Sequence, residues 1–239
     1  MRDGWNTWLT LVVLISNQPG SIMKMLTGKC TGYFVICAAM VTGSSAATSA
    51  PMFKTSFDCV TATAPVEKLI CRDAQLARMD LELNRLYRLA LTDERSVPPP
   101  EKVITDQQFW TLLRNQCASE ANPKACAVGR YAERAYQLRQ GSAIVRTRDP
   151  DRLTEGPFAF KCAGLNVLIS ATFFNADPGV VYLRWANTSM TLSQEPGGSG
   201  IRYSGKDGTG FYSFWQSADD VVFQKPGAGQ MSCKAEPIG

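Results

Sequence analysis

The side chains that could do chemistry in this sequence are limited first by what is missing. The 239 residues include 8 cysteines, 25 lysines and arginines and 21 aspartates and glutamates, but no histidine. Imidazole-assisted nucleophilic catalysis, imidazole acid/base chemistry and histidine-ligated metal sites are therefore excluded within one chain. The carboxylates of Asp219 and Asp220 are adjacent in sequence, so in an extended strand the two side chains point apart. We expect a protein that is not an enzyme and uses no cofactor.

The first 50 residues have the pattern of an export signal rather than of a domain. Lys24 and Lys29 supply the charged region, 33–41 the apolar region, and the small residues of 43–50 the cleavage sites. The apolar run is shorter than the ~20 residues of a membrane-spanning helix. The segment before Met23 is redundant for export, so it is expected to be an upstream extension that is not needed.

Cys37 raises the alternative of a lipid anchor, which would make the protein an outer-membrane lipoprotein. A lipoprotein signal needs small residues just before the modified cysteine, and Phe34, Val35 and Ile36 fit that requirement poorly. Export to the periplasm followed by cleavage is the favoured expectation, with membrane association only if the chain is lipidated.

The six cysteines after residue 50 are expected to form disulfides, because an even number in an exported chain indicates bridges rather than thiols. They are Cys59, Cys71, Cys117, Cys126, Cys162 and Cys233. Their spacing lacks the close pairs of a zinc site, so no metal is expected. We predict the pairs Cys59–Cys71 and Cys117–Cys126, although four cysteines permit three connectivities. The third predicted pair is Cys162–Cys233.

Residues 53–140 are expected to form a small helical domain. Apolar residues recur at three- and four-residue steps over 76–90, the pattern of an amphipathic helix, and Asp73 is a suitable N-cap for it. A second helix is expected to start at Pro100 and a third to end at Gly141. So small a three-helix core gains about 2–4 kcal/mol from each disulfide.

The periodicity changes across 141–156, a polar interval predicted to be a linker. From 157 to 239 apolar residues alternate with a period of two, in short segments separated by turn residues. The predicted strands are 158–162, 165–174, 180–186, 190–194, 201–204, 211–216, 221–224 and 230–233. With no room for crossover helices they must form an antiparallel barrel or sandwich. The predicted fold class is therefore α+β, in two domains.

The pattern over about 56–140 resembles the N-terminal domain of the LprI-type lysozyme-inhibitor family. The resemblance is carried by Phe57-Asp58-Cys59, Glu67-Lys68-Leu69-Ile70-Cys71, Leu76, Asp80, Leu86-Tyr87, Gln108, Trp110, Arg114, Cys117, Cys126 and Tyr131. This motif is mainly a fold signature. Trp110 and Tyr131 are accordingly expected in the core rather than on a contact surface.

The segment from about 158 to 234 resembles the membrane-bound lysozyme inhibitors of c-type lysozyme, the MliC family. The resemblance is carried by Phe160-Lys161-Cys162, the glycine-rich run from Pro196 to Tyr203, Phe214-Trp215 and Ser232-Cys233. It implies a small β-barrel with a Ser-Gly-x-x-Tyr loop that enters the lysozyme cleft. Here that loop comprises Ser199, Gly200, Ile201, Arg202 and Tyr203.

The chemistry of this loop suits such a target, since lysozyme uses a protonated and an ionised carboxyl group facing each other across its groove. Gly200 and its glycine neighbours allow backbone angles closed to other residues. Ser199 would carry a hydroxyl donor to the tip, and Arg202 would add a charge-assisted hydrogen bond. Tyr203 would pack under the loop and set its angle.

The second contact loop of that family usually presents a lysine before a glycine, and this sequence departs from the pattern. Gln216 and Ser217 follow the Phe-Trp pair instead. The resemblance then implies a loop that has lost a cation directed at the catalytic carboxylates. Lys206 and Arg202 are the two candidate substitutes for that cation.

The expected partner is a c-type lysozyme, bound in the periplasm of a Gram-negative bacterium. From 157 to 239 basic and acidic residues are equal in number, so steering toward a basic enzyme is weak. No basic stripe with interleaved aromatics suggests nucleic acid. The alternative function is a non-inhibitory envelope module that binds a periplasmic partner or acts as a spacer.

Overall fold

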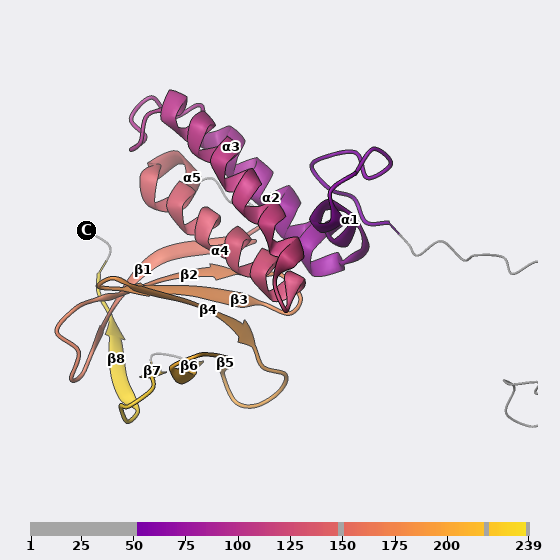
Figure 1. Ribbon diagram of the computed structural model, residues 1–239. Coiled ribbons are helices and arrows are strands. Elements are labelled where there is room, and N and C mark those ends of the chain that lie inside the picture. The colour runs from indigo at the N-terminus through magenta and orange to yellow at the C-terminus, as the bar shows by residue number, and fades with distance from the viewer. Residues whose placement is uncertain (1–51, 148–150, 218–219, 238–239) are drawn as a thin grey trace, which may run out of the picture. The chain divides into compact units, whose positions relative to one another are not determined.

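The computed structural model describes residues 52–147, 151–217 and 220–237, which belong to one compact unit, Thr48–Gly239. The export signal, its upstream extension and Cys37 lie outside the described residues. The described helices precede the strands in the chain (Figure 1). The helices are α1 (Pro65–Arg72), α2 (Ala74–Ala90), α3 (Pro100–Gln116), α4 (Pro123–Gly141) and α5 (Ala143–Thr147), with a 3-10 turn, η1, at Cys117–Ser119.

The three long helices are those that the sequence predicts. Asp73 caps α2 by accepting a hydrogen bond from the backbone of Leu76 over 3.0 Å. Pro100 opens α3, where its missing N–H costs nothing, and α4 ends at Gly141 as expected. Two short helices, α1 and α5, are additional. None of the described helices combines the length and apolarity needed to cross a membrane.

A buried polar network occupies the centre of the helical part. Tyr131 is fully buried and donates its hydroxyl to Asp80 over 2.8 Å, while Arg114 donates to the same hydroxyl over 3.3 Å. Burial raises the pKa of Tyr131 well above its ordinary value, so the hydroxyl remains a donor. Trp110 is also buried and meets Tyr131 edge to face. The expectation that both aromatics belong to the core is confirmed.

The strands form a closed antiparallel barrel in which each strand pairs with its neighbours in sequence and the last pairs with the first. They are β1 (Thr154–Cys162), β2 (Ile169–Phe174), β3 (Val180–Trp185), β4 (Thr188–Gln194), β5 (Ile201–Asp207), β6 (Gly210–Ser217), β7 (Asp220–Gln224) and β8 (Met231–Ala235). Cys162 and Cys233 are direct partners across the β1–β8 seam and are disulfide-bonded. The other described disulfides are Cys59–Cys71 and Cys117–Cys126. The predicted α+β class, with a small disulfide-bonded helical part before a small barrel, is confirmed.

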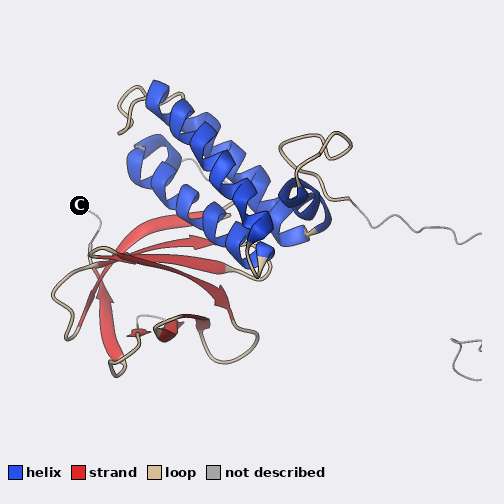
Figure 2. Ribbon diagram, viewed as in Figure 1, coloured by secondary structure: helices blue, strands red, loops and turns tan. Residues whose placement is uncertain are grey.

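Two hydrophobic cores lie on opposite sides of the barrel wall. The first fills the barrel, where Phe160, Leu183, Phe214 and Phe223 are almost completely buried. The second is shared between the helices and the outer side of β2 and β3. Figure 2 shows the helices above the part of the barrel formed by β1 to β4.

The outer surface of β2 and β3 contributes directly to the helical core. Phe174, Val180 and Tyr182 are buried there, and the ring of Tyr182 lies 5.2 Å from that of Tyr136 on α4. Gln75 of α2 adds a hydrogen bond of 2.6 Å to the carbonyl of Pro178, in the β2–β3 loop. Helices and barrel therefore bury apolar surface against each other.

The interval 141–156, for which the sequence predicts a linker, is itself packed in its described part. It contains α5 and the first residues of β1, and Val145 of α5 is fully buried. Arg139 of α4 donates to the carbonyl of Gly156 over 2.7 Å and to the Thr154 hydroxyl over 3.1 Å. The first residues of β1 are thus hydrogen-bonded to the end of α4.

This shared core leads to a prediction about unfolding. With disulfides intact, the mature chain is expected to lose its helices and its barrel in one transition, because separating them exposes Phe174, Val180 and Tyr182 together. Both probes would be applied to a Trp110→Phe variant of the mature chain, whose remaining tryptophans, Trp185 and Trp215, lie on β3 and β6. Far-UV circular dichroism would then follow the helices, and tryptophan fluorescence would follow the barrel during urea unfolding. Midpoints that differ between the two probes would contradict the prediction.

Candidate functional site

The barrel fold brings the two predicted contact loops to the same end of the barrel. The first connects β4 to β5 and includes Ser199 and Gly200, and the second connects β6 to β7. Ile201 at the start of β5 pairs with Gln216 at the end of β6. The predicted residues Gln216 and Ser217 therefore lie beside the first loop, and residues 218–219 lie outside the described part of the chain.

The tip of the first loop depends on backbone angles that favour glycine. Gly197, Gly198 and Gly200 have φ angles of 81°, 105° and 78°. A Cβ atom on Gly200 would also collide with the carbonyl oxygen of Gln216 and the side chain of Ser217. Gly200 is thus needed both for the turn and for the close approach of the two loops.

Ser199 is exposed and its hydroxyl makes no hydrogen bond to any described residue. Its carbonyl oxygen, in contrast, accepts a hydrogen bond of 2.9 Å from the indole of Trp215 on β6. At the base of the loop, the Glu195 backbone donates to the carbonyl of Arg202 over 2.8 Å. The loop is therefore tied at two points while its serine hydroxyl faces solvent.

Arg202 and Tyr203 follow each other on β5 and so point to opposite sides of the barrel wall. Arg202 is on the outside, opposite Trp215, with its Nε atom 4.0 Å from a carboxylate oxygen of Glu195. Both side chains of this ion pair are substantially exposed, so the pair contributes at most about 1 kcal/mol. The guanidinium is available to another carboxylate.

Tyr203 faces the barrel interior, where it is 3% exposed and its ring lies 5.7 Å from that of Phe173. Burial raises the pKa of Tyr203 to about 12, and the carboxylate of Glu155 adds to the effect. The hydroxyl is therefore neutral at physiological pH. Tyr203 thus lies inside the barrel, on the strand that follows the loop, and its role in supporting the loop stays a prediction.

Lys206 does not reach this site. It lies five residues along β5 from Ile201, roughly 16 Å in an extended strand, near the turn to β6 at the other end of the barrel. Of the two bases considered as substitutes for the missing lysine, only Arg202 is beside the loop.

A depression of about 1020 Å³ opens beside the loop at the same barrel end. Its walls include the inward-facing rings of Phe158, Phe160, Phe173 and Tyr203, and Gly200 stands at its edge. The lining also includes the charged residues Glu155, Asp220, Lys234 and Glu236. The candidate surface thus combines a loop with an adjacent recess of mixed apolar and charged lining, a combination suited to binding another protein.

The bond between Trp215 and the loop is the feature that the sequence did not reveal. Phe214 and Trp215 are recognisable as strand residues, and alternation predicts that one faces inward and the other outward. Phe214 is indeed buried in the barrel, whereas Trp215 is only partly buried on the outside. Which carbonyl the outward indole would reach depends on cross-strand register and could not be deduced.

Comparison with known proteins gives matches for both parts of the chain. Residues 160–232 match the family model described as membrane-bound lysozyme-inhibitor of c-type lysozyme. Lipoprotein LprI of Mycobacterium tuberculosis and of Mycobacterium bovis is 30% identical over 195 residues, which cover 81% of this chain and 91% of the relative. No solved structure matches the chain significantly.

Proposed function

The chain belongs to the family of lipoprotein LprI, and on that premise we propose that it inhibits a c-type lysozyme by inserting the loop Ser199–Tyr203 into the active-site cleft. Its C-terminal domain is of the MliC type and its N-terminal part is of the LprI type. Both relationships support an association with the cell envelope. We place the mature chain in the periplasm, where it would protect peptidoglycan.

The observation that carries the proposal is that Ser199 is exposed while its carbonyl oxygen is hydrogen-bonded to the indole of Trp215. The bond from Trp215 to the Ser199 carbonyl, and the pairing of Gln194 with Tyr203 at the two ends of the loop, limit the conformations of the loop before it binds. A pre-organised loop loses less conformational entropy on association. The serine hydroxyl then meets the protonated and ionised carboxyl groups of the lysozyme cleft.

Arg202 supplies the positive charge of the proposed contact. It lies on the strand directly after the loop, and its ion pair with Glu195 at 4.0 Å is long and exposed. Exchanging that partner for a desolvated carboxylate in the cleft gains a stronger, charge-assisted hydrogen bond. In this proposal Arg202 performs part of the role of the lysine that the second loop lacks.

Two single substitutions test the contact. Ser199→Ala is expected to weaken inhibition about tenfold, the effect of one lost hydrogen bond of about 1.4 kcal/mol. Arg202→Ala is expected to weaken it at least as much, and more at low salt, because a charge is removed. Inhibition constants would be measured from the clearing of cell-wall suspensions by a c-type lysozyme.

Lys206→Ala is the matched control, since it removes a base from the same strand at the opposite barrel end. It should leave inhibition unchanged. Equal losses for Lys206→Ala and Arg202→Ala would show that only net charge matters and would reject the loop contact. Absence of inhibition by the unmodified chain would favour the envelope module that binds another partner.

A further inference from the structure

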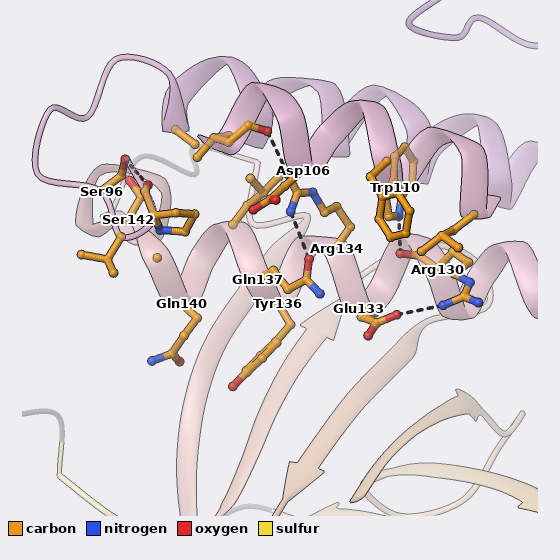
Figure 3. Close-up of a pocket in the computed structure, with 18 of the residues that line it drawn as sticks. Ser96, Asp106, Trp110, Arg130, Glu133, Arg134, Tyr136, Gln137, Gln140 and Ser142 are labelled. Atoms are coloured by element: carbon orange, nitrogen blue, oxygen red, sulfur yellow. Dashed lines mark hydrogen bonds and ion pairs between the residues drawn. The ribbon is translucent and has the colours of Figure 1, made fainter. Parts of the chain in front are cut away.

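A second cavity, of about 470 Å³, lies between α3 and α4 in the helical part (Figure 3). None of its lining residues belongs to the proposed inhibitor loop. Its size is within the range of small-molecule sites in proteins. Arg184 of β3 also borders it, so the barrel contributes one side of the cavity. The lining combines apolar side chains with several charged ones.

Arg134 on α4 is the most unusual of these side chains. It is 4% exposed, and Figure 3 shows it between the two helices. It donates to the side-chain oxygens of Gln107 and Gln137, each over 3.0 Å. It also donates to the carbonyl of Val103 over 3.2 Å. All three acceptors are neutral, and no described carboxylate forms an ion pair with Arg134.

A buried guanidinium without a counter-ion is costly, because buried charges are normally paired. Burial lowers the pKa of Arg134, an effect that nearby Asp106 and Tyr87 only partly oppose. The guanidinium also carries five N–H donors, of which three are used. Two donors therefore remain at a side chain that borders the cavity.

The acidic residues around the cavity already have partners. Asp106 forms an ion pair of 2.6 Å with Lys102, and Glu133 forms one of 3.4 Å with Arg130. Arg184 has no described ion-pair partner and lies over the ring of Tyr136 at 5.8 Å. The cavity is thus bordered by two guanidinium groups without an ion pair to any described residue.

The other side of the cavity is apolar and accessible. Trp110 and Leu113 of α3 line it, and Phe109 at its edge is 62% exposed. Val97, from the loop before α3, is 78% exposed and also lines the cavity. An exposed phenylalanine beside a buried cation offers an apolar surface and a charge to one ligand.

We propose that this cavity binds a small organic carboxylate carried on an apolar or aromatic group. The carboxylate accepts hydrogen bonds from the free donors of Arg134, with Arg184 adding a second positive charge. The apolar group packs against Phe109, Trp110 and Leu113. A carboxylate matches the planar guanidinium and supplies the counter-charge that the fold lacks. This site is independent of the lysozyme contact.

The test uses the mature full chain, with benzoate as the probe and benzamide as its neutral counterpart of nearly the same shape. Titration would be followed by ¹H–¹⁵N NMR, including the Nε–H signal of Arg134. Benzoate is expected to shift this signal in a saturable way, while benzamide at the same concentrations does not. Equal shifts with both probes, or none with benzoate, would overturn the proposal.

The variant Gln137→Glu places a carboxylate where Arg134 now donates to an amide. It should raise the thermal midpoint by about 2–4 °C, as expected for a small gain in a chain of this size. It should also weaken benzoate binding at least tenfold, because the counter-charge is already present. Gln108→Glu is the control, adding the same charge at an exposed position of α3 outside the cavity.

Gln108→Glu should bind benzoate like the unmodified chain. Benzoate affinity that is the same in Gln137→Glu and Gln108→Glu would overturn the assignment of Arg134 as the carboxylate-binding group. Inhibition of lysozyme is not part of the readout, so the outcome is separate from that of the proposed function.

Discussion

Replacing Gly200 by alanine is expected to weaken lysozyme inhibition about 100-fold while the barrel stays folded, a loss of about 2.7 kcal/mol. The added methyl group would collide with the carbonyl oxygen of Gln216 and with Ser217, and alanine also disfavours the φ angle of 78°. Relief requires the loop to move away from β6. That movement breaks the bond between Trp215 and Ser199 and displaces the tip that enters the cleft.

Gly208→Ala is the control for this prediction. Gly208 lies in the β5–β6 turn at the other barrel end, and a Cβ atom there has open space. Inhibition constants of both variants would be measured with the same c-type lysozyme, and circular dichroism and thiol titration would verify the fold and the disulfides. Full inhibition by Gly200→Ala would mean that the loop geometry is not used for binding.

A second large effect is expected where the helices meet the barrel. Glu82→Ala should lower the free energy of unfolding by about 1.5–3 kcal/mol, the usual contribution of hydrogen bonds to a buried charged group. The Glu82 side chain is fully buried, pairs with Arg85 at 2.7 Å and accepts a hydrogen bond of 2.6 Å from Thr154 of β1. Its removal takes away an ion-pair partner of Arg85 in α2 and a hydrogen-bond acceptor of Thr154 in β1. Urea unfolding of the mature chain would measure the change.

Glu133→Ala provides a matched comparison. Glu133 and Arg130 also form an ion pair three residues apart, but both side chains are more than one third exposed. Such a pair contributes roughly 0–1 kcal/mol. Similar losses of stability for Glu82→Ala and Glu133→Ala would show that the link to Thr154 adds nothing.

Local features of the helical part could be predicted from the sequence because they depend on neighbouring residues. The cap at Asp73, the start at Pro100 and the end at Gly141 each follow from side chains within a few positions. The attachment of the helices to the barrel was not predicted. It joins Glu82 to Thr154, residues 72 positions apart.

The sequences of β2 and β3 do indicate that both faces of these strands are covered, through a pattern other than period-two alternation. Phe173-Phe174 in β2 and Val180-Val181-Tyr182 in β3 are continuous apolar runs, typical of strands covered on both faces. The burial of all five residues agrees with that pattern. Which element covers the outer face is a tertiary property, and no local pattern specifies it.

For the candidate site, the side of the barrel wall that each β5 residue faces could be predicted. Which residues of other strands lie next to the loop could not. Alternation separates the outward Arg202 from the inward Tyr203, and glycine at 200 indicates a special backbone angle. That Gln216 and Ser217 lie against Gly200, and that Lys206 lies far from it, depends on the register between β5 and β6.

The seam between the first and last strands has a further consequence for an inhibitor that works outside the cytoplasm, where proteases are present. A cut in the exposed segment between Gln194 and Ile201 would divide the chain into a piece with β1 to β4 and a piece with β5 to β8. Because Cys162 and Cys233 belong to different pieces, their bond keeps both in one molecule. The barrel is therefore built so that a nicked inhibitor does not fall apart.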